Sequence, residues 1–191
     1  MLVGFPRVSR HRAFRPETEV LPWRDAPDEL AAWQQGRTGF ALIDAAMRQL
    51  AATGWMHNRL RMLVAMFLSK NLLIDWRAGE RFFMGQLIDG DLAANNGGWQ
   101  WSASTGTDAV PYFRLFNPLS QSHRFDPEGR FIRHWLPELA HLDNRAIHEP
   151  AALGGLFGAP DYPRPLVDLA ASRARALAAF RDLPSRETDH E

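Results

Sequence analysis

Three short stretches of the chain concentrate polar side chains that could bind a ligand. The first, residues 55–62, reads Trp-Met-His-Asn-Arg-Leu-Arg-Met and begins a predicted helix with a donor-rich face beside an apolar stripe. Arg59 and Arg61 are two positions apart, so on a helix they point to different sides. One of the two can therefore meet solvent or a phosphate while the other faces inward.

The second stretch places two carboxylates around a glycine, at Asp89, Gly90 and Asp91, where a helix is predicted to start. Carboxylates at such a position can cap the helix. They can equally accept hydrogen bonds from the N–H and hydroxyl groups of a ligand. An inward Arg61 needs an acidic partner, and Asp89 is the nearest candidate by residue type.

The third stretch, residues 95–101, reads Asn-Asn-Gly-Gly-Trp-Gln-Trp. Each glycine inside a helix costs about 1 kcal/mol relative to alanine. The pair Gly97 and Gly98 therefore indicates a close approach of the backbone to a ligand or to another helix. Taken singly, each of the three stretches also has a purely structural interpretation: a capped helix, a turn or a packed tryptophan.

Helices must position these stretches. The spacing of apolar residues predicts helices at about 28–35, 38–53, 57–71, 76–87, 92–104, 128–136 and 166–180. Thr38 and Asp75 are predicted N-caps. Residues 105–127 are predicted to be irregular, and a loop of that length in a compact domain is usually functional. No alternating strand pattern of useful length is present, so the predicted fold class is all-α.

Composition narrows the classes of protein. The chain has 191 residues, 22 basic and 22 acidic side chains, 46% hydrophobic residues and no cysteine. One ordered domain is expected, without disulfides, thiolate metal sites or a thiol nucleophile. The histidines show no metal-ligand spacing, so no metal is expected. No apolar run is long enough for a membrane span and no secretory signal is visible, which predicts a cytoplasmic protein without a membrane partner.

Two features stand apart from an ordinary composition. Seven tryptophans against two tyrosines is an unusual choice of aromatic residues for a chain this small. Residues 1–26 form an Arg/Pro-rich segment that is predicted to be irregular and to enter the domain, because the first convincing helix starts only near Pro27. Residues 1–5 could be the end of something cut away.

Together the motifs WMHNRLRM, LIDWRAGERFFMGQLIDGDLAANNGGWQWSASTGTD and PYFRLFNP resemble the photolyase and cryptochrome family. Within that family the resemblance is to class I cyclobutane pyrimidine dimer photolyases, from about Phe14 to Pro150. It implies a helical FAD-binding domain that is incomplete at its N-terminus, with residues 27–191 forming its C-terminal part. The family's α/β antenna domain, which can carry a second chromophore, is absent from this chain.

The resemblance also implies a role for each matching residue. The FAD-binding positions are Arg61, Asp89, Gly90, Asp91 and Asn95, with Asn95 facing flavin N5. The positions of the electron-transfer chain are Trp99, Trp76 and Trp23, from proximal to distal. The DNA-facing positions are Asn58, Arg59, Met62, Trp101 and Ser120, with Met62 and Trp101 as walls of the lesion pocket. The remaining tryptophans Trp33, Trp55 and Trp135 are expected to pack in the core.

The function implied for the parent enzyme, expected to be monomeric, is light-dependent repair of DNA that contains pyrimidine dimers. Reduced FAD donates an electron to the dimer, the cyclobutane ring splits and the electron returns. The first alternative is a cryptochrome-like blue-light photoreceptor, against which Asn95, Met62 and Trp101 argue. The second is a truncated chain that is inactive and nearly colourless on its own.

Overall fold

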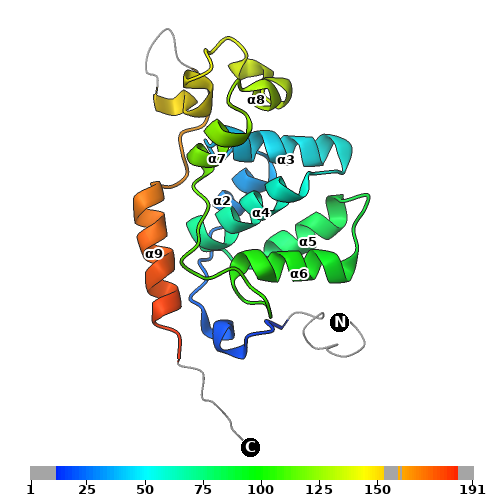
Figure 1. The fold of residues 1–191 in the computed structure, drawn as a ribbon, viewed down its shortest axis with the longest axis vertical. Helices are drawn as coiled ribbons and strands as arrows, with labels where there is room; N and C mark the ends of the chain where they lie inside the picture. The colour runs from blue at the N-terminus through cyan, green and yellow to red at the C-terminus, as the bar shows by residue number, and fades with distance from the viewer. Residues whose placement is uncertain (1–11, 153–158, 160, 185–191) are drawn as a thin grey trace, which may run out of the picture.

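In the computed structural model, which describes residues 12–152, 159 and 161–184, every regular element is a helix (Figure 1). This confirms the predicted fold class. The α-helices are α2 (Pro27–Gln34), α3 (Ala41–Thr53), α4 (Asn58–Met66), α5 (Trp76–Gln86), α6 (Leu92–Ala103), α7 (Pro118–Phe125), α8 (Arg130–Trp135) and α9 (Leu169–Arg181). None of the helices in the described ranges has the length and apolar character needed to cross a membrane.

Five short elements complete the described part. They are the 3-10 helices η1 (Pro16–Val20), η3 (Pro137–Leu139), η4 (Ala146–His148) and η5 (Pro150–Ala152), and the π-helix η2 (Phe67–Asn71). The π-helix continues α4 directly, so the single helix predicted over 57–71 exists but changes its hydrogen-bond pattern in its last turn. Such π segments inside helices are rare and occur frequently at functional sites.

The main core lies where α3, α4, η2, α5 and α6 meet. The apolar stripe of α3 is buried as its spacing predicts, and Trp33 of α2 is fully buried beside it. The Trp33 indole N–H donates to the Val64 carbonyl oxygen at 3.1 Å, so its one polar atom is satisfied. In Figure 1, α5 and α6 lie side by side, and α9 runs along the opposite edge of the molecule, where it packs against η2.

A smaller second core joins the other side of α3 to α8 and the short helices that follow it. Buried Asp44 holds this junction together, because its carboxylate accepts hydrogen bonds from Thr38, from the Gly39 N–H and from the Tyr162 hydroxyl. Burial raises the pKa of Asp44, and these hydrogen bonds oppose that rise. The prediction that Thr38 caps α3 is wrong: Phe40 is the N-cap residue, and the Thr38 hydroxyl donates to Asp44 instead.

The prediction of an irregular segment over 105–127 is also wrong in its second half, where α7 forms. The Asn117 side chain caps α7 by accepting from the N–H groups of Leu119 and Ser120. Pro118 occupies the first turn of the helix, where its missing N–H costs nothing. The Asn-Pro pair is thus a helix start rather than part of a loop.

The segment that leads into the helices is more ordered than predicted. Residues 1–11 of the predicted irregular segment lie outside the described residues, whereas Pro16–Val20 form η1. The Phe14 N–H donates to Gln100 Oε1 at 2.8 Å, and the Arg15 N–H donates to the Thr105 carbonyl at 2.9 Å. These contacts attach the segment to the C-terminal end of α6.

Candidate flavin and DNA site

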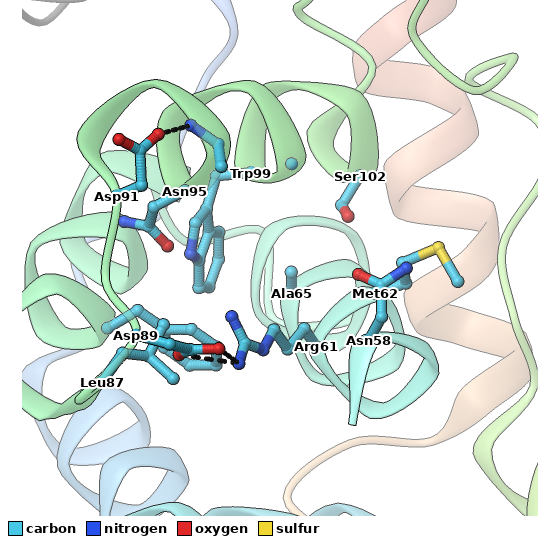
Figure 2. Close-up of a pocket in the computed structure, with 13 residues that line it drawn as sticks. Asn58, Arg61, Met62, Ala65, Leu87, Asp89, Asp91, Asn95, Trp99 and Ser102 are labelled. Carbon is cyan, nitrogen blue, oxygen red and sulfur yellow. Dashed lines mark hydrogen bonds and ion pairs between the residues drawn. The ribbon is translucent and has the colours of Figure 1, made fainter. Parts of the chain in front are cut away.

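A cavity of about 140 Å³ opens between α4, the end of α5 and α6 (Figure 2). The predicted site residues that line it are Asn58, Arg61, Met62, Asp89, Asp91, Asn95 and Trp99. The other lining residues are Ala65, Phe83, Leu87, Ala94, Gly98 and Ser102. Residues of all three sequence stretches therefore meet at one place.

Arg61 and Asp89 form the expected ion pair at one end of this cavity. One terminal nitrogen of Arg61 lies 2.9 and 2.8 Å from the two Asp89 carboxylate oxygens, and its Nε donates to the Met56 carbonyl oxygen at 2.7 Å. Because the Asp89 side chain is 48% exposed, the pair adds little to stability. The pair instead fixes the direction of the guanidinium. A donor that is held in place in this way is ready to bind the polar edge of a ligand.

Asn95 is oriented by a buried acid on the neighbouring helix. Its Nδ2 donates to the Glu80 carbonyl oxygen and to Glu80 Oε1, both at 3.0 Å. Glu80 is 7% exposed and comes from α5. The amide nitrogen is thus occupied on the side away from the cavity, and Figure 2 shows the Asn95 oxygen turned toward the cavity. Asn95 therefore presents a hydrogen-bond acceptor to any ligand there.

Trp99 forms a buried wall of the cavity, and a glycine on α5 sets its position. The Trp99 ring makes edge contacts with Phe83 at 5.1 Å and Trp33 at 6.0 Å between ring centroids. A Cβ at Gly79 would lie only 2.1 Å from the Trp99 ring. By contrast, a Cβ at Gly97 or Gly98 would meet nothing within 4 Å. The predicted approach of another helix to this glycine pair is wrong, while the space beside Gly98 belongs to the cavity and is open to a ligand.

Asp91 and Gly90 have local roles beside the cavity. Asp91 caps α6 by accepting from the Ala94 N–H at 2.8 Å. Gly90 is exposed in the turn that precedes the cap. The carboxylate of Asp91 thus serves the helix and borders the cavity at the same time, so the structural and the binding interpretation hold together.

The predicted DNA-facing residues separate into three places. Asn58 and Met62 line the cavity. Arg59 lies in a neighbouring groove of about 390 Å³, where its guanidinium sits 4.4 Å above the Phe125 ring and donates to Gln121 at 3.4 Å. Ser120 is exposed on α7, the helix that supplies Phe125 to this groove.

Trp101 lies on a different face of α6 from Trp99. It lines a third cavity of about 210 Å³ together with Gly97, Gln100 and residues 106–109. The first part of the loop after α6 is therefore a wall of the cavity beside Trp101.

The predicted electron-transfer residues are less closely connected. Trp76 is 1% exposed and Trp23 is half-buried against the main core. The indole nitrogens of both are buried, and neither has a hydrogen-bond partner in the described part of the chain. Among the ring pairs described, Trp99 contacts Trp33 and Phe83 rather than Trp76 or Trp23.

The expected packing role is confirmed for two of the remaining tryptophans. Trp33 is fully buried, and Trp135 packs against the second core. Trp55 contradicts the expectation, because it is 44% exposed at the groove that contains Arg59.

Two residues that sequence reasoning missed are Glu80 and Gly79. Glu80 follows Trp76 by four positions, which places an acid on the apolar face shared by Trp76, Phe83 and Leu87. A carboxylate on that face was the available signal, because a buried acid must have partners. Nothing in the local pattern distinguishes Gly79, since the need for a glycine arises from α6, far along the chain.

Comparison with known proteins identifies relatives of this chain. The family model described as the FAD binding domain of DNA photolyase matches residues 1–182. The deoxyribodipyrimidine photo-lyase of Escherichia coli is 58% identical over 181 residues, covering 94% of this chain and 38% of the relative. The chain thus spans well under half the length of this relative.

Solved structures superpose closely on the helices. A class III photolyase from Agrobacterium tumefaciens gives a TM-score of 0.88 at 42% identity, over 94% of this chain and 39% of that one. A Synechocystis cryptochrome gives a TM-score of 0.80 at 41% identity, over 84% of this chain and 35% of that one. With its family model, its relatives and its fold in agreement, the chain belongs to the family of DNA photolyase FAD-binding domains.

Proposed function

We propose that this chain forms the flavin-facing and lesion-facing part of an enzyme that uses light to split cyclobutane pyrimidine dimers in DNA. The observation that carries the proposal is the cavity in which the Arg61–Asp89 pair, the Asn95 amide oxygen and the Trp99 wall converge. The names of the relatives, which are deoxyribodipyrimidine photo-lyases, support the same function.

The residues of the cavity fit one side of an FAD molecule. A flavin ring is flat and mostly apolar, with N–H and C=O groups along its edge, so it needs apolar walls and a few fixed polar groups. Phe83, Leu87 and Trp99 supply the walls, and the space beside Gly98 leaves room for the ring. When bound and reduced, FAD would supply the electron that opens the cyclobutane ring after absorption of light.

In this scheme, the residues of the chain bind the cofactor and orient it. Because Glu80 occupies the Asn95 nitrogen, the Asn95 oxygen accepts a hydrogen bond from a ligand N–H. Arg61, held by Asp89 and the Met56 carbonyl, donates to the ligand edge. Trp99 is 3% exposed, so its ring excludes water from the side of the cavity that it lines. Such neighbours tune the electronic properties of a bound cofactor.

We assign electron transfer from the surface to Trp23, Trp76 and Trp99, with Trp99 nearest the flavin. An indole is large and oxidisable, and the buried positions of Trp76 and Trp99 support this assignment. On the DNA side, Asn58 and Met62 would meet a dimer flipped out of the duplex. Arg59, Trp101 and Ser120 would contact the flanking strand.

The size of the cavity indicates that this chain supplies only part of the cofactor site. Its volume of about 140 Å³ is well below the ~300–1,000 Å³ of a site that encloses a drug-sized ligand. We propose that residues 27–191 correspond to the C-terminal part of the helical FAD-binding domain. The remaining walls would come from the part of the relatives that this chain does not cover, where an α/β antenna domain can carry a second chromophore. The parent enzyme is proposed to act as a monomer in the cytoplasm.

A chimera tests the function without depending on the isolated chain. In it, this chain replaces the matching 181 residues of the Escherichia coli relative. The chimera is expected to purify with bound flavin and to restore thymine absorbance in an illuminated dimer-containing oligonucleotide, but not in darkness. Equal rates in light and darkness would reject the proposal. Flavin binding and a light response without any repair would favour the photoreceptor.

The isolated 191-residue chain provides the complementary measurement. Because the cavity encloses one side of the ligand only, we expect the purified chain to be nearly colourless. Stoichiometric flavin absorbance in the purified chain would show that the described walls are sufficient, contrary to this expectation.

A further inference from the structure

The only lysine of the chain, Lys70, lies fully buried in the π-helical turn η2. Its ammonium group donates to two backbone carbonyl oxygens, that of Tyr112 at 3.4 Å and that of Arg114 at 3.2 Å. Both carbonyls belong to the loop between α6 and α7, about forty residues further along the chain. A side chain from the core thus reaches directly into this loop.

A lysine is an expensive choice for this position. Removing an ammonium group from water is unfavourable unless it is paired well, and replacement of a buried charge by an apolar side chain is often neutral or stabilising. The cost is visible in the pKa of Lys70, which burial lowers to about 7. A methionine would fill the same space without this cost, so filling the core does not account for the lysine.

The loop that Lys70 contacts connects two residues of the proposed DNA-facing surface. It leaves α6 just after Trp101, and it ends at Asn117, which caps the helix that carries Ser120. At the start of the loop, the Val110 N–H donates to the Trp101 carbonyl oxygen, and the Ser104 hydroxyl donates to the Val110 carbonyl oxygen.

In the second half of the loop, Phe116 packs against the main core. The Tyr112 ring stacks on Phe180 of α9, with ring centroids 5.8 Å apart. On the outer side, Tyr112, Phe113 and Arg114 are exposed. Between these two packed rings, the hydrogen bonds from Lys70 hold the backbone itself, at the stretch that presents Phe113 and Arg114 to solvent.

We propose that Lys70 is the positioning residue for the loop of residues 105–117 and thereby sets which loop side chains the protein presents to DNA. By bridging the carbonyls of Tyr112 and Arg114, Lys70 fixes the path of the chain between Trp101 and Ser120. Aromatic and arginine side chains on a fixed loop suit the bases and phosphates of an unpaired strand. The choice of DNA as the ligand rests on the proposed function, whereas the anchoring of the loop does not.

Hydrogen exchange measures the anchoring directly. In the Lys70→Met variant of the 191-residue chain, amide exchange in residues 105–117 is expected to rise at least tenfold while the melting temperature stays equal or increases. The matched control is Ser69→Ala, because Ser69 is equally buried in the same turn but donates to the Ala65 carbonyl in its own helix. Unchanged loop exchange in Lys70→Met, or an equal rise in Ser69→Ala, would overturn the proposal.

A spectroscopic measurement keeps the test valid if Lys70→Met does not fold. Selective labelling of lysine with ¹⁵N gives a single side-chain resonance, since the chain has one lysine. We expect this resonance to shift when a single-stranded oligonucleotide containing a thymine dimer binds the wild-type chain. A resonance that stays in place at saturating oligonucleotide would contradict a role for Lys70 in the DNA-facing loop.

Binding to the same oligonucleotide separates the two proposals. By fluorescence anisotropy, Lys70→Met is expected to bind at least fivefold more weakly than wild type, Ser69→Ala within twofold of it, and Lys70→Arg, which retains the donors, between the two. If the wild-type chain does not bind the oligonucleotide, the DNA assignment fails, and loop exchange still decides whether Lys70 anchors the loop.

Discussion

Two neighbouring surfaces use arginine in different ways. One is the wall of the cavity that we propose to face the flavin, and the other is the groove beside α7. In the cavity wall, Arg61 is held by the Asp89 carboxylate and by the Met56 carbonyl, at distances below 3 Å. In the groove, Arg59 rests on the Phe125 ring and reaches Gln121 at 3.4 Å. Arg61 therefore belongs to a rigid surface, whereas Arg59, two positions earlier, belongs to an adaptable one.

This difference matches what each proposed ligand demands. A cofactor whose reactivity depends on its neighbours needs donors and acceptors that are fixed before it binds. A DNA backbone is recognised largely through charge, and its contacts tolerate movement of the cation. We therefore expect substitutions in the cavity wall to weaken flavin binding strongly. Substitutions in the groove should weaken DNA binding moderately and change how its affinity depends on salt concentration.

The largest effect is expected from Asp89→Ala. The variant removes the partner that fixes Arg61, so flavin affinity in the chimera should fall about 30-fold, or roughly 2 kcal/mol. The measurement is a fluorescence titration with FAD. The control is Glu128→Ala, which removes the carboxylate from an exposed ion pair with Arg130 on the distant helix α8. Wild-type affinity in Asp89→Ala would remove the basis for calling this wall rigid.

A smaller effect, about tenfold in flavin affinity, is expected from Glu80→Leu. Without the carboxylate, one of the two bonds that orient the Asn95 amide is lost, and the amide can turn its nitrogen toward the cavity. Glu80→Gln keeps an oxygen acceptor and should retain most of the affinity. The absorbance spectrum of the bound flavin should change in the leucine variant only. Identical spectra and affinities in both variants would show that Glu80 does not orient Asn95.

A moderate effect confined to DNA is expected from Arg59→Ala. Loss of one phosphate contact should weaken binding of a dimer-containing oligonucleotide severalfold at low salt and reduce the slope of log affinity against log salt by about 1. Flavin affinity should not change. Arg37→Ala is the matched control, because the described hydrogen bonds of the Arg37 guanidinium go to Gln35 alone. An unchanged salt slope in Arg59→Ala would exclude Arg59 as a phosphate contact.

The smallest effect concerns the attachment of α7 and depends on pH. Burial and the nearby His123 lower the pKa of His148, whose Nδ1 lies 2.6 Å from the Ser122 hydroxyl oxygen. The pKa of His148 is lower in the folded chain than in the unfolded chain, so the unfolded chain takes up the proton first as the pH falls. The contribution of His148 to stability is therefore fully present above its unfolded pKa and decreases as the pH falls below that pKa. Between pH 7 and pH 5 the melting temperature should decrease slightly, and this decrease should disappear in His148→Gln. A decrease of the same size in the variant would assign it to other groups.

Sequence reasoning was sufficient for several features encoded by residue type and local spacing, although it failed for the start of α3 and for α7. The apolar stripe of α3 and the caps Asp75 and Asp91 follow from residue type and spacing. The pairing of Arg61 with Asp89 follows from residue type and from the family resemblance. The resemblance to the family supplied the role that we propose for the cavity.

Features that arise between distant segments were not accessible in this way. The location of the close approach at Gly79 rather than at Gly97 depends on how α5 and α6 pack. Trp55 is exposed at a groove that also includes Phe125 of α7, a helix that the spacing does not predict. The role of Glu80 needed knowledge of which helix faces Asn95.

The contact between Gly79 and Trp99 has a consequence for how variation in this family should be interpreted. Gly79 does not line the cavity, yet the space left by its missing side chain determines how far Trp99 can recede from it. A scan restricted to ligand-contacting residues would therefore treat a change at position 79 as neutral. A residue that does not contact the ligand can thus determine the dimensions of its binding site.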